Sequence, residues 1–192
     1  MSRRTIALFG GSFNPPHVCH VLASAYVLAC TDVDALWWMP VGRHPFDKDR
    51  LLASAHHRLA MCRRAAASLG DRVQVSDFEI RRGGVNHTVD TLEALRATHP
   101  DVAFRLVVGA DVLAESAAWK DFDRVVRLAP LIVIGRQGHP TPPGVRACPP
   151  LPDVRSSTVR ARLRAGLRCD HLVPASVLTY IEAEGLYGVG GR

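Results

Sequence analysis

Short apolar runs alternate along this chain with longer segments of helical periodicity, and this alternation limits the possible folds more than any other feature. The predicted strands cover Thr5–Phe9, Ala35–Met39, Val73–Val75, Phe104–Val108 and Leu131–Ile134. The predicted helices cover His17–Cys30, Ser54–Leu69, Thr88–Thr98, Asp121–Leu128, Ser157–Ala165 and Pro174–Glu184. Apolar strands separated by helices are typical of a parallel sheet with helices on both faces. The pattern therefore predicts an α/β fold with a Rossmann-like, doubly wound parallel sheet.

The length of the chain, 192 residues, is that of one compact domain. We expect residues 1–192 to form a single domain that ends in a small helical portion, from about residue 155 to residue 192. The stretch Gly135–Pro152 is rich in proline and glycine, so we expect a surface loop there and not a linker. Five scattered cysteines without a CxxC pair argue against a disulfide scaffold and a zinc ribbon.

The formal net charge of +6 favours acidic partners, either polyanions or small phosphorylated molecules. No basic run is interleaved with aromatic residues, so a nucleic-acid surface is the weaker interpretation. No apolar run approaches the roughly 20 residues that span a bilayer, and Thr5–Phe9 is shorter than the core of a signal peptide. We therefore expect a cytoplasmic protein that binds neither nucleic acid nor membrane. The sequence leaves open whether it forms a homo-oligomer.

The segment after the first predicted strand has the residues of a phosphate-binding loop. Ligands of open parallel sheets bind beyond the carboxyl ends of the strands, and Gly10 and Gly11 would let backbone N–H groups approach a phosphate there. His17 and His20 are three residues apart, so they share one face of the next helix and can donate to phosphate oxygens. A tight turn and histidines of the core or surface are the alternatives. A His-x-Cys-His metal site is disfavoured, because helical spacing turns Cys19 away from the His pair.

A second polar group precedes the helix predicted near the C-terminus. Ser156, Ser157 and Thr158 supply hydroxyls and free N–H groups, and Arg160 adds a planar cation, so this helix start can hold a triphosphate. The alternative is an ordinary cap on an exposed, arginine-rich helix.

Two candidates follow the strand Phe104–Val108. Asp111 can accept hydrogen bonds from ribose hydroxyls or help to place a metal, with a helix cap as the alternative. Trp119 can stack on a flat pyridine ring, although a Trp in an amphipathic stretch also suits the core.

The residues from Gly10 to His20 resemble the GxFxPxHxGH signature of the nucleotidyltransferases that adenylylate or cytidylylate small phosphorylated molecules. Further matches favour one member family, the nicotinate-nucleotide adenylyltransferases, and the resemblance covers nearly the whole chain. These matches are Gly83–Thr88, Gly109-Ala110-Asp111, Trp119, Arg136, Val154–Arg160, Leu172-Val173-Pro174, Tyr180-Ile181 and Gly185-Leu186-Tyr187.

The resemblance implies adenylyl transfer from ATP to nicotinate mononucleotide, which gives deamido-NAD and pyrophosphate. It implies His17, His20 and Arg160 as catalytic residues, and no metal ligands from the protein, because Mg²⁺ would be carried mainly by the ATP phosphates. The implied mononucleotide-binding residues are His87, Thr88 and Trp119. The implied ATP-binding residues are Gly10, Gly11, Ser12, Phe13, Asn14, His17, His20, Lys48, Gly109, Asp111, Arg136, Ser156, Ser157 and Arg160.

Several positions depart from the family pattern. Cys19 stands where Gly is usual, Asn14 replaces the commoner Asp, and His87 stands where Tyr is usual. Arg155 occupies the first Ser position of the late motif if Arg160 keeps its register, while a slip by one residue would restore the match. We prefer the register that keeps Arg160, because the helical pattern requires it.

Three rival functions stay open at this point. The nearest is a related adenylyltransferase that acts on nicotinamide mononucleotide or phosphopantetheine, and the next is a cytidylyltransferase. The third, from a different class, is a basic nucleic-acid-binding protein, which would leave both phosphate-binding motifs without a use.

Overall fold

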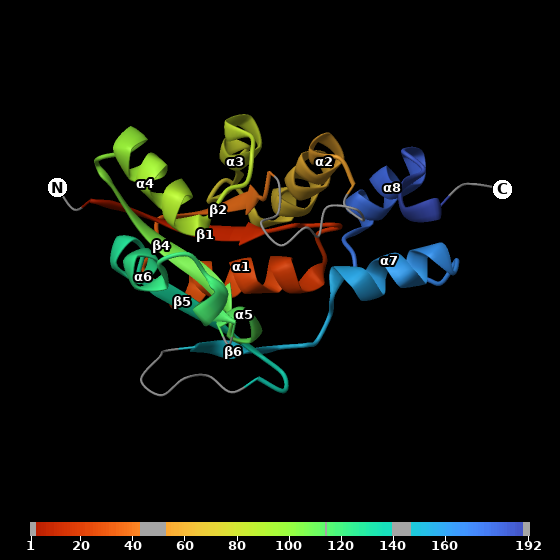
Figure 1. The fold of residues 1–192 in the computed structure, drawn as a ribbon. Helices are drawn as coiled ribbons and strands as arrows, with labels where there is room; N and C mark the ends of the chain where they lie inside the picture. The colour runs from red at the N-terminus through yellow and green to blue at the C-terminus, as the bar shows by residue number, and fades with distance from the viewer. Residues whose placement is uncertain (1–2, 43–52, 114, 140–146, 190–192) are drawn as a thin grey trace.

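A computed structural model describes residues 3–42, 53–113, 115–139 and 147–189 (Figure 1). Its centre is a six-stranded parallel sheet in the order β3-β2-β1-β4-β5-β6. The strands are β1 (Arg4–Gly11), β2 (Ala35–Pro40), β3 (Val73–Val75), β4 (Val102–Gly109), β5 (Leu131–Arg136) and β6 (Ala147–Leu151). The chain runs outward from β1 to β3 and then continues on the other side of β1 with β4. The strand order therefore reverses between β1 and β4, where this class of sheet binds its ligands.

Helices cover both faces of the sheet, which confirms the predicted fold class, and Figure 1 shows α1 and α4 on opposite sides of β1. The α-helices are α1 (Val18–Cys30), α2 (Ala55–Ala66), α3 (Phe78–Arg82), α4 (Thr88–Thr98), α5 (Ala110–Leu113), α6 (Phe122–Leu128), α7 (Ser156–Arg164) and α8 (Ala175–Ala183). Short 3₁₀ turns are η2 (Ala67–Leu69), η3 (Ser116–Ala118) and η4 (Leu186–Gly188). No helix in the described ranges is long and apolar enough to cross a bilayer.

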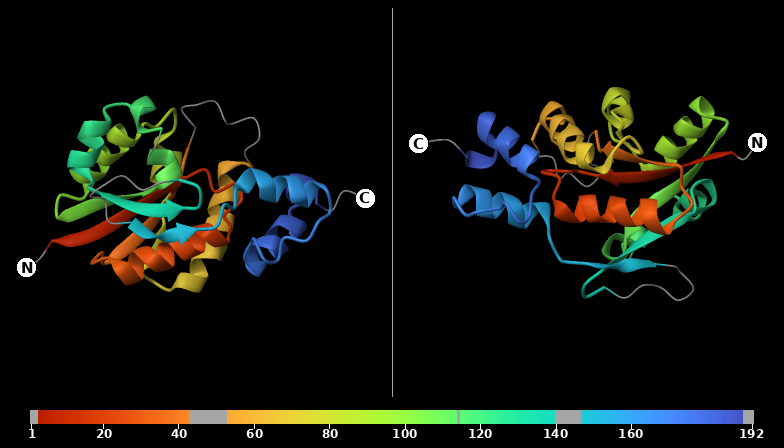
Figure 2. Two further views of the ribbon diagram at one scale, coloured as in Figure 1. Left: turned by 90° about the horizontal axis from the view of Figure 1, so that it is seen from below. Right: turned by 180° about the vertical axis from the view of Figure 1, so that it is seen from behind.

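Two apolar clusters fill the space between the sheet and its helices. Successive residues of a strand point to opposite faces, so Ala7 packs with Val27 of α1 in one cluster, while Ile6 and Leu8 pack with Leu92 of α4 in the other. The first cluster also holds residues of α2, α7 and α8. The C-terminal helices therefore share one apolar cluster with α1 and α2, and Figure 2 shows them together at the end of the molecule where the C-terminus lies.

The buried Trp38 connects β2 to α1 through its ring nitrogen. Its Nε1 donates to Ser24 Oγ at 2.8 Å, and that hydroxyl donates to the His20 carbonyl at 2.8 Å. The first turn of α1, which carries one of the candidate catalytic residues, is thus bonded to the centre of the sheet.

The strand β6 corrects the prediction of a surface loop over Gly135–Pro152. Residues Ala147–Leu151 pair in parallel with β5, with a register irregularity between Ile134 and Arg136. Proline lacks the N–H group that a central strand must donate, but at an edge strand one side of the backbone has no neighbour. Pro149 and Pro150 are therefore compatible with β6, because β6 is the last strand of the sheet.

Candidate active site

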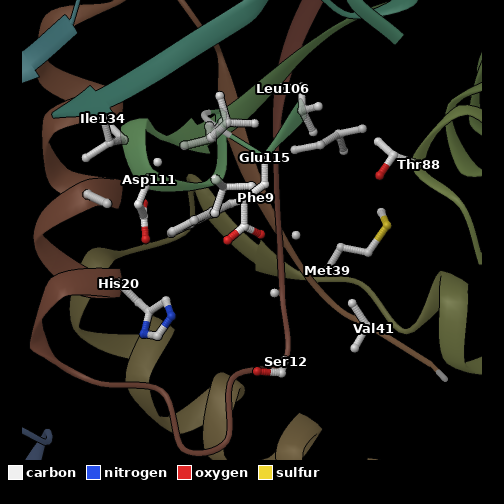
Figure 3. Close-up of a pocket in the computed structure, with 18 of the residues that line it drawn as sticks. Phe9, Ser12, His20, Met39, Val41, Thr88, Leu106, Asp111, Glu115 and Ile134 are labelled. Atoms are coloured by element: carbon white, nitrogen blue, oxygen red, sulfur yellow. The ribbon is translucent and has the colours of Figure 1, made fainter. Parts of the chain in front are cut away.

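A cavity of about 810 Å³ opens at the carboxyl ends of β1, β2 and β4, where the strand order reverses. Figure 3 shows Ser12, His20, Thr88 and Asp111 around this space, each from a different segment of the chain. The structure therefore brings the candidates from the first loop and from the region after β4 to one place, as the strand-end rule predicts.

The end of β1 and the loop that follows it form one wall of the cavity through Gly10, Gly11 and Ser12. A Cβ atom on Gly10 would meet nothing within 4 Å, whereas one on Gly11 would lie 3.3 Å from the Phe13 ring. The Phe13 ring therefore leaves little room for a side chain at position 11, whereas nothing in the described part of the protein crowds position 10. The open space at Gly10 is what close approach of a phosphate to the backbone requires.

Phe13 and Asn14 belong to the same motif but do not line the cavity. The Phe13 side chain is 1% exposed and stacks on Trp38 with ring centroids 5.0 Å apart. The Asn14 Oδ1 atom accepts hydrogen bonds from the Ala53 N–H at 3.0 Å and from the Tyr187 hydroxyl at 2.7 Å. The structure thus places these two residues behind the loop, where they fix its path.

His17 and His20 both line the cavity at the start of α1. The His17 backbone N–H donates to His20 Nδ1 at 3.0 Å, and the two rings are 3.9 Å apart between centroids. Because His20 Nδ1 accepts this bond, the proton of the neutral ring sits on Nε2. His20 is thereby prepared as a hydrogen-bond donor.

Both imidazoles are held in the neutral form. Burial, and secondarily the charge of Arg136, lowers the pKa of His17 to about 4. Burial and the neighbouring His17 lower the pKa of His20 well below its ordinary 6.5. A buried cation would carry a desolvation cost that a neutral donor avoids, so this pair offers hydrogen bonds without titrating near pH 7.

Arg136, at the end of β5, lines the cavity and pairs with two acidic side chains, Asp111 and Asp153. It donates to Asp111 through Nη1 at 2.9 Å, and to Asp153 through Nη2 at 2.7 Å and Nε at 3.0 Å. Arg155 donates to the same Asp153 oxygen at 3.0 Å. These two arginines hold the pKa of Asp153 below its ordinary value, with Arg155 the larger cause. Gly109 belongs to this corner, because a Cβ atom there would overlap the Asp111 carboxylate.

The segment before α7 reaches the first loop from the other end of the chain. Ser156 lines the cavity, and its Oγ donates to the Pro15 carbonyl at 2.9 Å. Arg160 Nη1 donates to the Asn14 carbonyl at 2.7 Å. Ser157 is exposed, and neither it nor Arg160 lines the cavity. The structure therefore brings the two predicted phosphate-binding segments together. Of Ser156, Ser157 and Arg160, however, Ser156 alone lines the cavity.

The three residues expected around the mononucleotide all line the cavity, and Figure 3 shows Thr88 across the cavity from His20. His87 and Thr88 are at the start of α4, and Trp119 follows η3. The Trp119 ring packs edge-on against Phe122, with centroids 5.9 Å apart, and stays partly exposed to the cavity. Lys48, which was expected at the ATP phosphates, lies outside the described residues.

Sequence reasoning missed other residues on the cavity wall, of which Glu79 is the most buried acid. It comes from α3 and accepts a hydrogen bond from Thr91 Oγ1 at 2.9 Å, and burial raises the pKa of its carboxyl group. Lys120 and Glu115 also line the cavity. Glu115 and Lys120 stand close to Trp119 in the sequence and could have been found from it, whereas nothing in the pattern around Glu79 marks it.

No group of three or more His, Cys, Asp or Glu side chains in the described part of the chain is arranged to hold a metal ion. Asp111, which lines the cavity, and Asp153, which does not, are both paired with Arg136.

These features are those of a nucleotidyltransferase. They are a parallel sheet whose first strand ends in two glycines, a histidine pair at the start of α1, and the start of α7 at the same cavity. The family model described as cytidylyltransferase-like matches residues 8–162, and the chain belongs to that family. A relative from Anaeromyxobacter dehalogenans strain 2CP-1 is 50% identical, over 96% of this chain and 97% of the relative. Another, from Myxococcus xanthus strain DK1622, is 41% identical over 96% of this chain and 95% of the relative. Both are named probable nicotinate-nucleotide adenylyltransferases, and these relatives place the chain in that branch of the family.

The solved structures agree on the fold. Nicotinic acid mononucleotide adenylyltransferase of Plasmodium falciparum, complexed with NaAD, matches with a TM-score of 0.82 at 20% identity and covers 98% of this chain and 100% of its own. A structure from Vibrio parahaemolyticus, described as a putative nicotinate-nucleotide adenylyltransferase, has a TM-score of 0.71 at 21% identity, covering 96% of this chain and 95% of its own. At these identities the likeness shows that the architecture is shared.

Proposed function

We propose that this protein transfers the adenylyl group of ATP to nicotinate mononucleotide, forming deamido-NAD and pyrophosphate. The names of the relatives support the substrates. The observation that carries the proposal is that the β1–α1 loop and the start of α7, near opposite ends of the chain, line one cavity and are bonded to each other at Pro15 and Ser156. A triphosphate in that cavity can touch both segments.

The reaction needs alignment and charge stabilisation, and no covalent intermediate. A phosphate oxygen of the mononucleotide attacks the α-phosphorus of ATP, the bond from that phosphorus to the bridging oxygen breaks, and its electron pair leaves with pyrophosphate. In our proposal the backbone at Gly10 to Ser12 cradles the phosphates and His20 donates from Nε2 as negative charge builds up. His17 and the start of α7 at Ser156 complete the phosphate side.

The remaining assignments follow from position. Arg136 and Asp111 hold the nucleotide at the ends of β5 and β4, beside Gly109. Trp119 stacks on the pyridine ring, with His87 and Thr88 next to it at the start of α4. In the conformation described here Arg160 braces the loop through the Asn14 carbonyl; its contact with the leaving pyrophosphate, like those of Ser157 and Lys48, is a prediction.

Mg²⁺ enters, in this proposal, as part of the substrate MgATP. The ion would neutralise phosphate charge. Asp111, two residues after Gly109, is the cavity carboxylate that would be available to it. The residues of this chain supply hydrogen-bond donors around the phosphates, which complements an ion that keeps its water ligands.

A parallel assay tests the proposal and its rivals. The purified protein is incubated with ATP and, in separate reactions, nicotinate mononucleotide, nicotinamide mononucleotide or phosphopantetheine, and with CTP in place of ATP. We expect pyrophosphate release with ATP and nicotinate mononucleotide, with deamido-NAD identified by mass. Faster turnover with another pair would replace the proposal by that rival. DNA binding that weakens steeply with salt, without any turnover, would favour a nucleic-acid-binding protein.

A further inference from the structure

We propose that Arg155 binds the β- and γ-phosphates of ATP and the pyrophosphate product. Nothing in the family resemblance assigns this residue, because the late motif has Ser at its position. The inference rests on the proposed function for the identity of the ligand. Its basis in the structure is that Arg155 lines the cavity beside Ser156, whereas Arg160, the cation expected there, does not.

Arg155 can exchange its bond to Asp153 for a bond to phosphate, because the Asp153 carboxylate would still be paired with Arg136. One Asp153 oxygen accepts from Arg155 Nε at 3.0 Å and also from Arg136 Nη2 at 2.7 Å and Nε at 3.0 Å. When Arg155 turns away, Asp153 keeps both bonds to Arg136. The Arg155 side chain is also the more exposed of the two, at 54% against 22% for Arg136. Arg136 is therefore the fixed member of the group and Arg155 the one that can move.

The backbone holds Arg155 at the place where a phosphate would need a cation. Its carbonyl accepts from the Val159 N–H at 3.0 Å, which makes it the residue before the first turn of α7. The free N–H groups of that turn lie next to it. A guanidinium has five donors in a planar fork, so it can hold two phosphate oxygens at once. Arg155 can thus supply the positive charge that Arg160, bonded to the Asn14 carbonyl, does not present to the cavity.

Substitution of Arg155 tests the proposal, and Arg168 offers a matched control. Arg168 pairs with Asp170 at 2.7 Å, two residues away as in the Arg155–Asp153 pair, but does not line the cavity. Arg155→Ala should lower kcat/KM for ATP roughly tenfold or more, the usual effect of losing a hydrogen bond to a charged group. It should change KM for nicotinate mononucleotide less than about twofold, and Arg155→Lys should restore part of the loss. If kcat/KM for ATP is the same in Arg155→Ala as in Arg168→Ala, the proposal is overturned.

A binding measurement separates this inference from the proposed function. Calorimetric titration with sodium pyrophosphate requires no turnover, and the dissociation constant should rise roughly tenfold or more in Arg155→Ala and stay unchanged in Arg168→Ala. If the wild-type protein makes no deamido-NAD, the proposed function fails, while this titration still decides the role of Arg155. Equal affinities in wild type and Arg155→Ala would refute it. Arg155→Ser, which removes the charge but keeps a good helix-capping residue, provides the same test should the Ala variant fold poorly.

Discussion

A single backbone hydrogen bond determines what His20 can do. The His17 N–H occupies Nδ1 of His20, so the remaining ring nitrogen is a donor, and burial keeps the ring neutral by lowering its pKa. Helix geometry alone allows two histidines on one face, but it does not say which nitrogen faces the ligand. The chemistry of this residue therefore depends on the first turn of α1 being closed as the structure has it.

Replacing His20 by Ala should lower kcat for adenylyl transfer by roughly 10²–10³-fold, the usual effect of losing one donor to a developing anion. The far-ultraviolet circular dichroism spectrum should stay that of the wild type. His171→Ala is the control, because His171 is exposed and does not line the cavity. A His20→Ala enzyme with near wild-type kcat would show that the donor is another residue.

Substitution of Gly10 should affect ATP binding without affecting the stability of the fold. Because a Cβ atom at Gly10 would meet nothing within 4 Å, Gly10→Ala should leave the midpoint of thermal unfolding unchanged. A phosphate seated against the backbone would collide with the new methyl group, so KM for ATP should rise roughly tenfold or more. An unchanged KM would mean that no phosphate approaches the backbone at this residue.

The lowered pKa of His17 predicts that acid weakens the fold. Its pKa falls from 6.5 to about 4 on folding, mainly through burial. Between these values the unfolded chain binds a proton that the folded chain does not, so the free energy of unfolding falls as the pH drops through this range. From pH 7.5 to pH 5 we expect this residue to cost the wild type about 2 kcal/mol.

Urea unfolding of wild type and His17→Gln at both pH values measures this contribution. The wild type should lose about 2 kcal/mol more than the variant on acidification, because Gln does not titrate. Equal losses in the two proteins would mean that His17 is protonated in the folded state as readily as in the unfolded chain.

At the scale of elements, the strands and long helices could be predicted because their apolar periodicity is strong. The helix over Thr88–Thr98 has the predicted bounds, and β1 extends the predicted run by a residue or two at each end. The edge strand β6 was missed because its prolines match a loop in every local respect. Short helices such as α3 and α5 carry too few turns to show a period.

The convergence of the candidate segments at one cavity could be predicted in outline, because motifs at strand ends and helix starts meet by the geometry of a parallel sheet. What could not be predicted is which motif side chains line the cavity. Phe13 and Asn14 are in the motif yet support the loop from behind, since their contacts, Trp38 and Tyr187, come from segments distant in sequence. Arg155 is on the cavity wall for a similar reason, which is the path of the chain between β6 and α7.

The turn η4 should stabilise the first loop through Tyr187. Its hydroxyl donates to Asn14 Oδ1 at 2.7 Å, so Tyr187→Phe should lower the free energy of unfolding by about 1 kcal/mol, the typical net value of such a bond. The Tyr26 hydroxyl has no hydrogen-bond partner in the described ranges, so Tyr26→Phe serves as the control. Urea denaturation compares the two, and equal stabilities would show that the bond contributes nothing.

At the scale of the whole molecule, we propose that the chain works as one domain, because the cavity is lined by segments from Leu8 to Ser156 and the helices after it are bonded to the first loop. The bonds from Ser156 to Pro15 and from Arg160 to Asn14 join α7 to the first loop, and the Val18 N–H donates to the Leu172 carbonyl at 2.8 Å. The C-terminal helices are thus attached to the start of α1 at several points. A ligand that binds between these segments should affect both.

Hydrogen exchange measured by mass spectrometry can follow this coupling along the chain. ATP alone should slow exchange in peptides that cover Gly10–His20 and in peptides that cover Arg155–Val159, to the same degree and with the same dependence on concentration. Nicotinate mononucleotide should instead protect the start of α4 and the region of Trp119. Peptides from Ala67–Val75, away from the cavity, should not respond. At about 100 times its dissociation constant, a ligand adds about 2.7 kcal/mol to stability, enough to measure. Protection of the first loop without α7 would mean that the triphosphate touches one segment alone, and the architecture inferred for the site would be wrong.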